Sequence, residues 1–174
     1  MEAAAGGGTL SLAPTKVRPG AARRSSGRPV LLATLGVPLD PRASAFAVDS
    51  AVESGRELVV VNVTKLEPLG LSMIMGYDAL PEFTPQVSES IQHSAELARS
   101  LGVRVERLRI RSPRPVPALL ELVRERRPGL LVFGPKPSAL RPKRYRRAVA
   151  ALRELTDCLV WVAPRESAAG GAGG

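Results

Sequence analysis

The sequence alternates between short apolar runs and longer segments of helical periodicity, and this alternation restricts the fold more than any other feature. Most of the apolar runs are continuous and rich in Val and Leu, as strands buried on both faces of a sheet are. One run instead alternates apolar with charged residues, which is typical of an edge strand. The predicted strands are residues 29–36, 57–63, 103–110, 130–134 and 158–163.

Helices are predicted between these strands. Each helical segment has apolar residues three or four positions apart, on a face that can pack against a sheet. Gly55 and Gly102 follow the first two helices, where a left-handed residue commonly ends a helix. The residues expected to face the core are Ala45, Val48 and Val52 in the first helix, Val87, Ile91, Ala95, Ala98 and Leu101 in the second (81–101), Val116, Leu119, Leu120 and Val123 in the third, and Tyr145, Ala148, Val149 and Leu152 in the fourth.

Strands and helices that alternate through short connections form right-handed crossovers and a parallel sheet. The predicted fold class is therefore α/β, with a single doubly wound, Rossmann-like sheet of five parallel strands and helices on both faces. Ligands of such sheets bind beyond the carboxyl ends of the strands, where the strand order reverses. The loops after the first and fourth strands are therefore the expected ligand-binding edge.

The two ends of the chain differ in composition from its centre. Residues 1–28 are rich in Ala, Gly, Pro and Ser, and contain five basic residues and one acidic residue. They therefore supply nearly half of the net charge of +9 that the whole chain carries. Such a segment has little apolar surface to bury, so we expect it and residues 165–174 to be disordered tails of a folded domain, residues 29–164. We favour a solvated basic tail over a loose anchor for nucleic acid or an organelle transit peptide.

Composition also argues against several classes of protein. No apolar run reaches the roughly 20 residues needed to span a bilayer, so we expect a cytoplasmic protein that does not contact a membrane. Cys158 and His93 are the single cysteine and histidine, which rules out an internal disulfide and a structural zinc site. His93 has no nucleophile near it in the sequence, and Glu121 and Glu125 have the spacing of a solvated helix face. We therefore expect neither a metal nor an enzymatic activity.

Taken together, the residues resemble the universal stress protein family. The resemblance covers residues 29–164 and depends on the five strands that alternate with helices, on Gly134 after the fourth strand, on small residues two turns later, and on the closing segment "TDCLVWVAP". It implies a sheet in the order 3-2-1-4-5, a role in regulation or the stress response, and a homodimer formed through the last strand, 158–163.

Family members that bind ATP carry Gly-x-x-Gly-x9-Gly-Ser/Thr after the fourth strand and an Asp at the end of the first. In this chain Gly134 matches the first glycine, and Val63 matches a family valine that lines the adenine site. The Asp position holds Leu35, the second and third glycine positions hold Pro137 and Arg147, and the hydroxyl position holds Ala148. Glycine-rich loops bind phosphate through converging backbone N–H groups, and proline has none. The resemblance thus implies a degenerate nucleotide motif, with ATP disfavoured and any other cofactor unknown.

The basic segment "RPKRYRR", residues 141–147, is a second candidate site. Pro142 suits the first position of a helix, which places Lys143 and Arg144 in the first turn, where the positive end of the helix dipole disfavours cations. A bound anion would relieve this repulsion, and its site would be made from Lys136, Ser138, Arg141, Lys143, Arg144 and Arg147. The alternative, which we favour, is a solvated basic helix end screened by salt.

The same cations could contact nucleic-acid phosphates without sequence preference. Tyr145 is the one aromatic residue among them and falls on the buried stripe, so specific recognition of bases is not expected.

Residues 65–80 are unusually apolar for a loop, and either form a lid or a contact with a protein partner through Met73, Ile74 and Met75, or fold back into the core.

We therefore expect a non-catalytic, universal-stress-protein-like regulatory homodimer that does not bind ATP in the usual way. Two alternatives remain. One is a dimer that binds a nucleotide with Arg and Lys in place of the glycine-rich loop, and the other is a basic module that binds nucleic acid non-specifically.

Overall fold

The computed structural model describes residues 27–66 and 85–164, and within them the chain forms five strands and four α-helices. The strands are β1 (Val30–Thr34), β2 (Leu58–Lys65), β3 (Val105–Ser112), β4 (Leu130–Phe133) and β5 (Leu159–Val162). The helices are α1 (Pro41–Ser54), α3 (Pro85–Ser100), α4 (Pro115–Arg126) and α5 (Pro142–Leu155), and a short 3-10 helix spans Pro137–Ala139.

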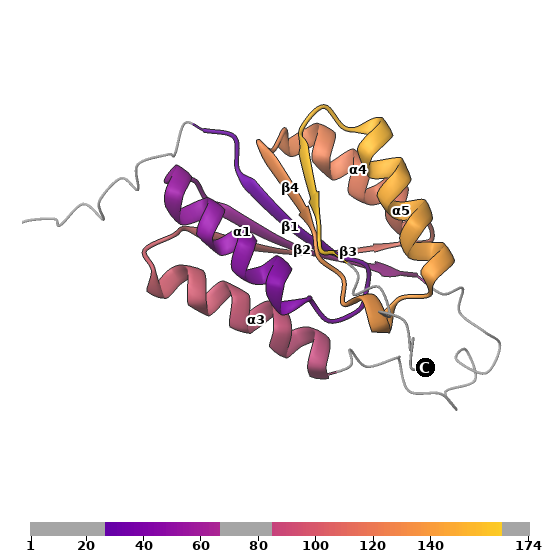
Figure 1. Cartoon of the computed structure of the whole chain (residues 1–174), viewed down its shortest axis with the longest axis horizontal. Coiled ribbons are helices and arrows are strands. Elements are labelled where there is room, and N and C mark those ends of the chain that lie inside the picture. Colours follow the sequence, from indigo (N-terminus) through magenta and orange to yellow (C-terminus); the bar gives the residue numbers. More distant parts are fainter. Residues whose placement is uncertain (1–26, 67–84, 165–174) are drawn as a thin grey trace, which may run out of the picture.

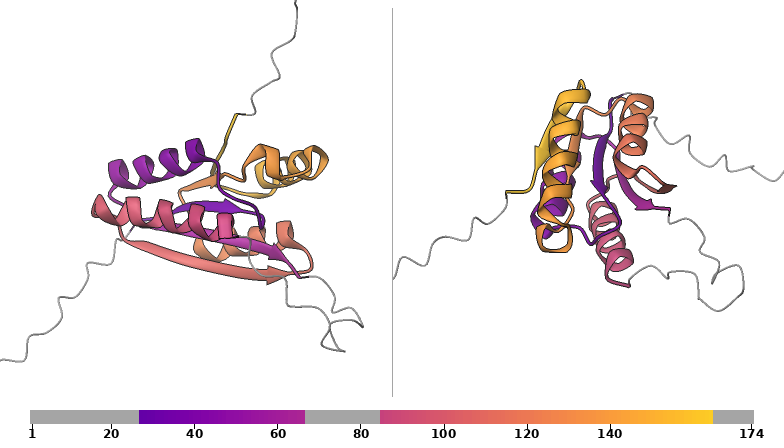
Figure 2. Two further views of the ribbon diagram at one scale, coloured as in Figure 1. Left: turned by 90° about the horizontal axis from the view of Figure 1, so that it is seen from below. Right: turned by 90° about the vertical axis from the view of Figure 1, so that its right-hand side faces the viewer.

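The strands form one parallel sheet in the order β3-β2-β1-β4-β5, which confirms the predicted class and strand order. β1 lies at the centre, where Val30 pairs with Leu58 of β2 on one side and with Leu130 of β4 on the other. β3 and β5 form the two edges of the sheet (Figure 2). Charged residues of β3 are exposed at every second position, including Arg107 and Arg109, as expected for an edge strand.

Helices cover both faces of the sheet, with α1 and α3 on one face and α4 and α5 on the other (Figure 1). Because successive side chains of a strand point to opposite faces, β1 contributes to two cores. Leu31 and Ala33 pack in the cluster beneath α4 and α5, while Val30 and Leu32 pack in the cluster beneath α1. All residues of β1 are buried, which explains its continuous apolar sequence.

The prediction for the buried face of α1 was partly wrong. Val48 is buried as expected, but Ala45 is exposed and Val52 is 42% exposed. The face against the sheet is instead made of small residues and Val48, namely Ala43, Ser44, Ala47, Val48 and Ala51. Alanines occur on both faces of this helix. The face that combines them with Ser44 packs inward, because its small side chains let the helix lie close to the sheet.

The second helix differs from its prediction at both ends. α3 begins at Pro85 in the structure, and the earlier start at Pro81 lies outside the described residues. Leu101, expected in the core, follows the helix and is 52% exposed, while Gly102 beside it has the left-handed φ of 81°. Most of the two predicted tails also lies outside the described residues, which include only residues 27 and 28 of the first tail. The same holds for the apolar segment 65–80 beyond residue 66.

Candidate functional site

The candidate site lies at the carboxyl ends of β1 and β4, where the strand order reverses. Two loops meet there, residues 35–40 after β1 and residues 134–141 after β4. They are joined by an antiparallel bridge between Leu39 and Pro135. The backbone N–H of Asp40 donates to the carbonyl of Gly134 at 2.8 Å, and that of Lys136 donates to the carbonyl of Pro38 at 2.8 Å. The crevice at the switch point is therefore closed by backbone pairing between the two loops.

Further hydrogen bonds hold the loop after β1, among them one from the N–H of Leu39 to Oγ of Ser90 at 3.1 Å. Gly36 turns the chain with a φ of 72° and donates its N–H to Oδ1 of the buried Asn62 at 3.0 Å. The hydroxyl of Thr34 donates to the carbonyl of Val37 at 2.6 Å. Asp40 then caps α1 by accepting from the N–H of Arg42 at 2.8 Å. These bonds fix the position from which α1 starts.

Gly134 has a packing role in this structure. A Cβ on this residue would lie 2.5 Å from Cβ of Ala43 in α1 and 3.3 Å from Cδ1 of Leu32. Its own N–H donates to the carbonyl of Ala33 at 3.0 Å. The close approach of α1 to β4 thus accounts for a glycine here without any ligand.

The backbone donors of the loop after β4 are largely used by the protein itself. Pro135 and Pro137 have no N–H. The N–H groups of Gly134 and Lys136 are bonded as described above, and that of Ala139 donates to the carbonyl of Lys136 at 3.0 Å. Of residues 134–139, this leaves at most the N–H of Ser138 for a ligand.

Two of the positions that depart from the nucleotide motif, Leu35 and Ala148, lie in the hydrophobic core with the matching Val63, whereas Pro137 is partly exposed and Arg147 is exposed. Leu35, Val63 and Ala148 belong to one buried cluster beneath α4 and α5, together with Leu140 and Tyr145. The hydroxyl of Tyr145 donates to the carbonyl of Ala163 at 3.2 Å and ties α5 to the end of β5. These three positions therefore contribute packing contacts in this chain.

The structure separates the residues proposed for an anion site. An open hollow of about 500 Å³ lies beside the paired loops. Its lining residues are Asp40, Pro41, Arg42, Lys136, Pro137, Ser138 and Pro164. The other four predicted residues do not line it, and Arg141, Lys143, Arg144 and Arg147 are instead exposed at the start and on the outer surface of α5.

Sequence reasoning missed two features of this hollow. Asp40 is a helix cap that could have been recognised, because Asp is a preferred cap residue and the proline after it suits the first helical position. Arg42 gave no such signal, since its place beside Lys136 and Ser138 depends on the pairing of two loops distant in sequence.

The other reactive residues considered from the sequence, His93, Glu121, Glu125 and Cys158, do not line the hollow. His93, Glu121 and Glu125 are exposed on their helices. Cys158 is half-buried, and desolvation raises the pKa of its thiol, which disfavours the nucleophilic thiolate. The described part of the chain has no group of three acidic, His or Cys residues placed to hold a metal, and no helix there is long and apolar enough to cross a membrane.

Comparison with known proteins gives one family. The model of the universal stress protein family matches residues 27–163. A universal stress protein solved in complex with cAMP is similar to the chain with a TM-score of 0.56 and 19% identity, over 80% of this chain and 99% of that one. No curated protein matches the sequence.

Two further structures have the same fold. The universal stress protein from Archaeoglobus fulgidus, in complex with dAMP, gives a TM-score of 0.53 at 17% identity, over 77% of this chain and 95% of that one. A universal stress protein family member from Burkholderia pseudomallei gives 0.54 at 19% identity, over 80% and 98%.

Proposed function

Because the chain belongs to the universal stress protein family, we propose that it is a non-catalytic regulatory protein of the stress response that does not bind ATP in the usual way. The observation that carries this proposal is the use of the donors in the loop after β4. Two of its residues are prolines, and three of its backbone N–H groups already bond to protein carbonyls.

A nucleotide phosphate needs several N–H groups that converge on it and are not already bonded. To supply them here, the loop would have to break the bond from Lys136 to Pro38 and the bridge between Leu39 and Pro135. Even then, Pro135 and Pro137 would contribute no donor. Opening the pairing would therefore free one backbone donor of the loop after β4, the N–H of Lys136.

Packing beneath the loop supports the same conclusion. Leu35, at the position of the family's acidic residue, is 2% exposed and cannot accept a hydrogen bond from a ribose. Ala148, at the hydroxyl position, is 1% exposed within the same cluster. Relatives of this fold have been solved with cAMP and dAMP, so the proposal is that this chain has lost a site that those proteins retain.

Titration calorimetry with ATP tests this proposal. The unaltered protein should give no heat of binding, and the variant Pro137→Gly/Arg147→Gly/Ala148→Ser should bind ATP measurably. A matched control, Pro137→Ala/Arg147→Ala, removes the same two side chains without supplying glycines or a hydroxyl and should bind no better than the unaltered protein.

The outcomes separate the alternatives. Tight binding of ATP by the unaltered protein, weakened by Lys136→Ala or Arg42→Ala, would mean that cations of the hollow replace the glycine-rich loop. If ATP affinity fails to rise in the triple variant, the motif departures do not explain the loss of binding and this part of the argument is wrong.

We further propose that the protein is a homodimer that pairs through β5. This strand is an edge of the sheet, and its residue Leu159 is 74% exposed. Trp161 beside it stacks on Phe46 of α1 with ring centroids 4.6 Å apart, so the edge is broad and apolar. An unpaired apolar edge strand favours pairing with another chain, and a second copy can supply an identical strand.

A further inference from the structure

The exposed face of α5 carries a row of cations. Lys143, Arg144, Arg146 and Arg147 are all exposed, and Arg153 continues the row towards the end of the helix. The buried residues of the helix are Tyr145, Ala148 and Leu152, which pack against the sheet. At 3.6 residues per turn, Lys143 and Arg147 lie one turn apart on the side opposite these buried residues. We call Lys143, Arg146, Arg147 and Arg153 the α5 basic stripe.

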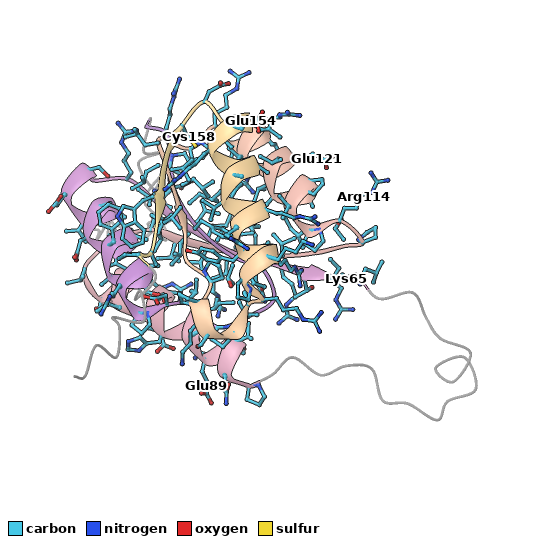
Figure 3. All side chains as sticks on the ribbon, turned by 45° about the vertical axis from the view of Figure 1, so that its right-hand side comes forward. Lys65, Glu89, Arg114, Glu121, Glu154 and Cys158 are labelled. Carbon is cyan, nitrogen blue, oxygen red and sulfur yellow. The ribbon has the colours of Figure 1, made fainter. Side chains whose placement is uncertain are left out.

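Charges of the α5 basic stripe are not neutralised by the protein. Lys143, Arg146 and Arg147 form no salt bridge with any residue in the described part of the chain. Glu154 is the one acidic residue of α5 and lies near its C-terminal end (Figure 3), whereas Lys143 is the second residue of the helix. The first turn of the helix contains no acidic residue.

This arrangement disfavours the folded helix in the free protein. Lys143 with Arg147, and Arg144 with Arg147, are like-charged pairs at helical spacing, and each pair repels. Cations in the first turn also oppose the helix dipole. A polyanion laid along the helix would relieve both effects at once, whereas a monovalent anion at one position would not.

Chemistry of the surrounding surface selects the kind of polyanion. The exposed face between Lys143 and Arg153 presents cations and the small Ala150, with no exposed aromatic residue. A protein interface or a membrane would need apolar anchors there, and single-stranded nucleic acid would need aromatic rings on which bases stack. The phosphates of a duplex need only cations at a suitable spacing.

Dimensions of the stripe fit this ligand. From Lys143 to Arg153 the helix rises by about 15 Å, at ~1.5 Å per residue. A duplex carries one phosphate charge per ~1.7 Å of axis, so this length faces several phosphates. We propose that the α5 basic stripe binds the phosphate backbone of a nucleic-acid duplex without reading its sequence. This inference does not rest on the nucleotide proposal, because none of its residues lines the hollow and Arg147 is the one residue that both arguments use.

Fluorescence anisotropy with labelled duplexes of about 20 base pairs, in DNA and RNA form and in two unrelated sequences, tests the proposal. The full chain should bind both sequences with equal affinity, and the logarithm of the association constant should fall linearly with the logarithm of the salt concentration. The variant Lys143→Ala/Arg146→Ala/Arg147→Ala should reduce the slope for DNA by about 2.7, because each phosphate contact contributes about 0.9. This corresponds to a loss of affinity of about 100-fold at ~0.15 M salt.

A matched control removes the same charge elsewhere. Arg99→Ala/Arg107→Ala/Arg114→Ala alters three exposed cations on α3, on β3 and before α4, and should change the affinity by less than about threefold. All six side chains are exposed, so both variants should retain the circular dichroism spectrum of the unaltered protein.

Several results would overturn the proposal. The first is no binding of either duplex at low salt, and the second is equal loss of affinity in the two triple variants. The third is tighter binding to anionic lipid vesicles or to a single strand than to a duplex. Binding of DNA but not RNA, or the reverse, would identify which duplex form the stripe accepts.

Discussion

Substitution of Gly134 by Ala tests whether this glycine serves packing. The added Cβ would lie 2.5 Å from Cβ of Ala43, whereas an ordinary contact between carbon atoms is about 3.5–4.0 Å. α1 would therefore have to move away from β4 by about 1 Å. Overpacking of this kind costs about 1–3 kcal/mol, and we expect Gly134→Ala to lower the free energy of unfolding by that amount. The melting temperature should fall by about 3 °C for each kcal/mol.

A double-mutant cycle makes the reasoning specific. Ala43→Gly removes the clashing carbon and alone should cost about 1–2 kcal/mol, from helix propensity and the lost buried methyl group. The double variant Gly134→Ala/Ala43→Gly should lose about 1–2 kcal/mol less stability than the sum of the losses in the two single variants. Ala47→Gly is the matched control, since Ala47 is equally buried in α1 but does not contact the added Cβ.

Urea unfolding followed by the fluorescence of Trp161, the single tryptophan, measures these values. The reasoning would be refuted if Gly134→Ala changed stability by less than about 0.5 kcal/mol, or if Ala43→Gly and Ala47→Gly coupled to it equally. Either result would mean that the glycine is needed for a reason other than the approach of α1.

Three further predictions concern α5, β5 and Cys158, which lies between them. Tyr145→Phe should lower the free energy of unfolding by about 1 kcal/mol, because the hydroxyl loses its bond to the carbonyl of Ala163, and an unchanged urea midpoint would contradict this. Because desolvation raises the pKa of its thiol, Cys158 should react with iodoacetamide at neutral pH more slowly than an unstructured cysteine peptide. Its reaction rate should also keep rising to a higher pH than that of the peptide. Equal rates would exclude this environment. A charge in the last strand, at Val160 or Val162, should give a monomer by light scattering, and Leu159→Asp is the preferred variant because its side chain is already 74% exposed; an unchanged dimer would exclude pairing through β5.

The fold was predictable because its signal is local. Continuous apolar runs mark the strands of a parallel sheet, and the glycines at 55 and 102 end their helices with positive φ as expected. The buried face of α1 was not predictable in the same way. Its sequence offers alanines on two faces, and the choice between them depends on how closely the helix can approach Gly134, a contact between residues far apart in the sequence.

The position of the candidate site was predictable, but the backbone pairing that closes it was not. The reversal of strand order identifies the loops after β1 and β4. The pairing of Pro38 with Lys136, and of Leu39 with Pro135, could not be inferred. These contacts join backbone groups of residues far apart in the sequence, and no pattern of side chains indicates them. For the same reason the division of the basic residues between the hollow and the α5 basic stripe became visible only in three dimensions.

The central proposal is that the switch-point loops do not bind a nucleotide as ATP-binding members of the family do. Native mass spectrometry of the freshly purified, untagged protein measures this most directly, since subunit number and any retained small molecule are recorded together. The account predicts a dimer whose mass equals that of two chains. A dimer that retains one nucleotide mass per subunit would contradict it, because the paired loops would then have to open and bind phosphate despite Pro135 and Pro137.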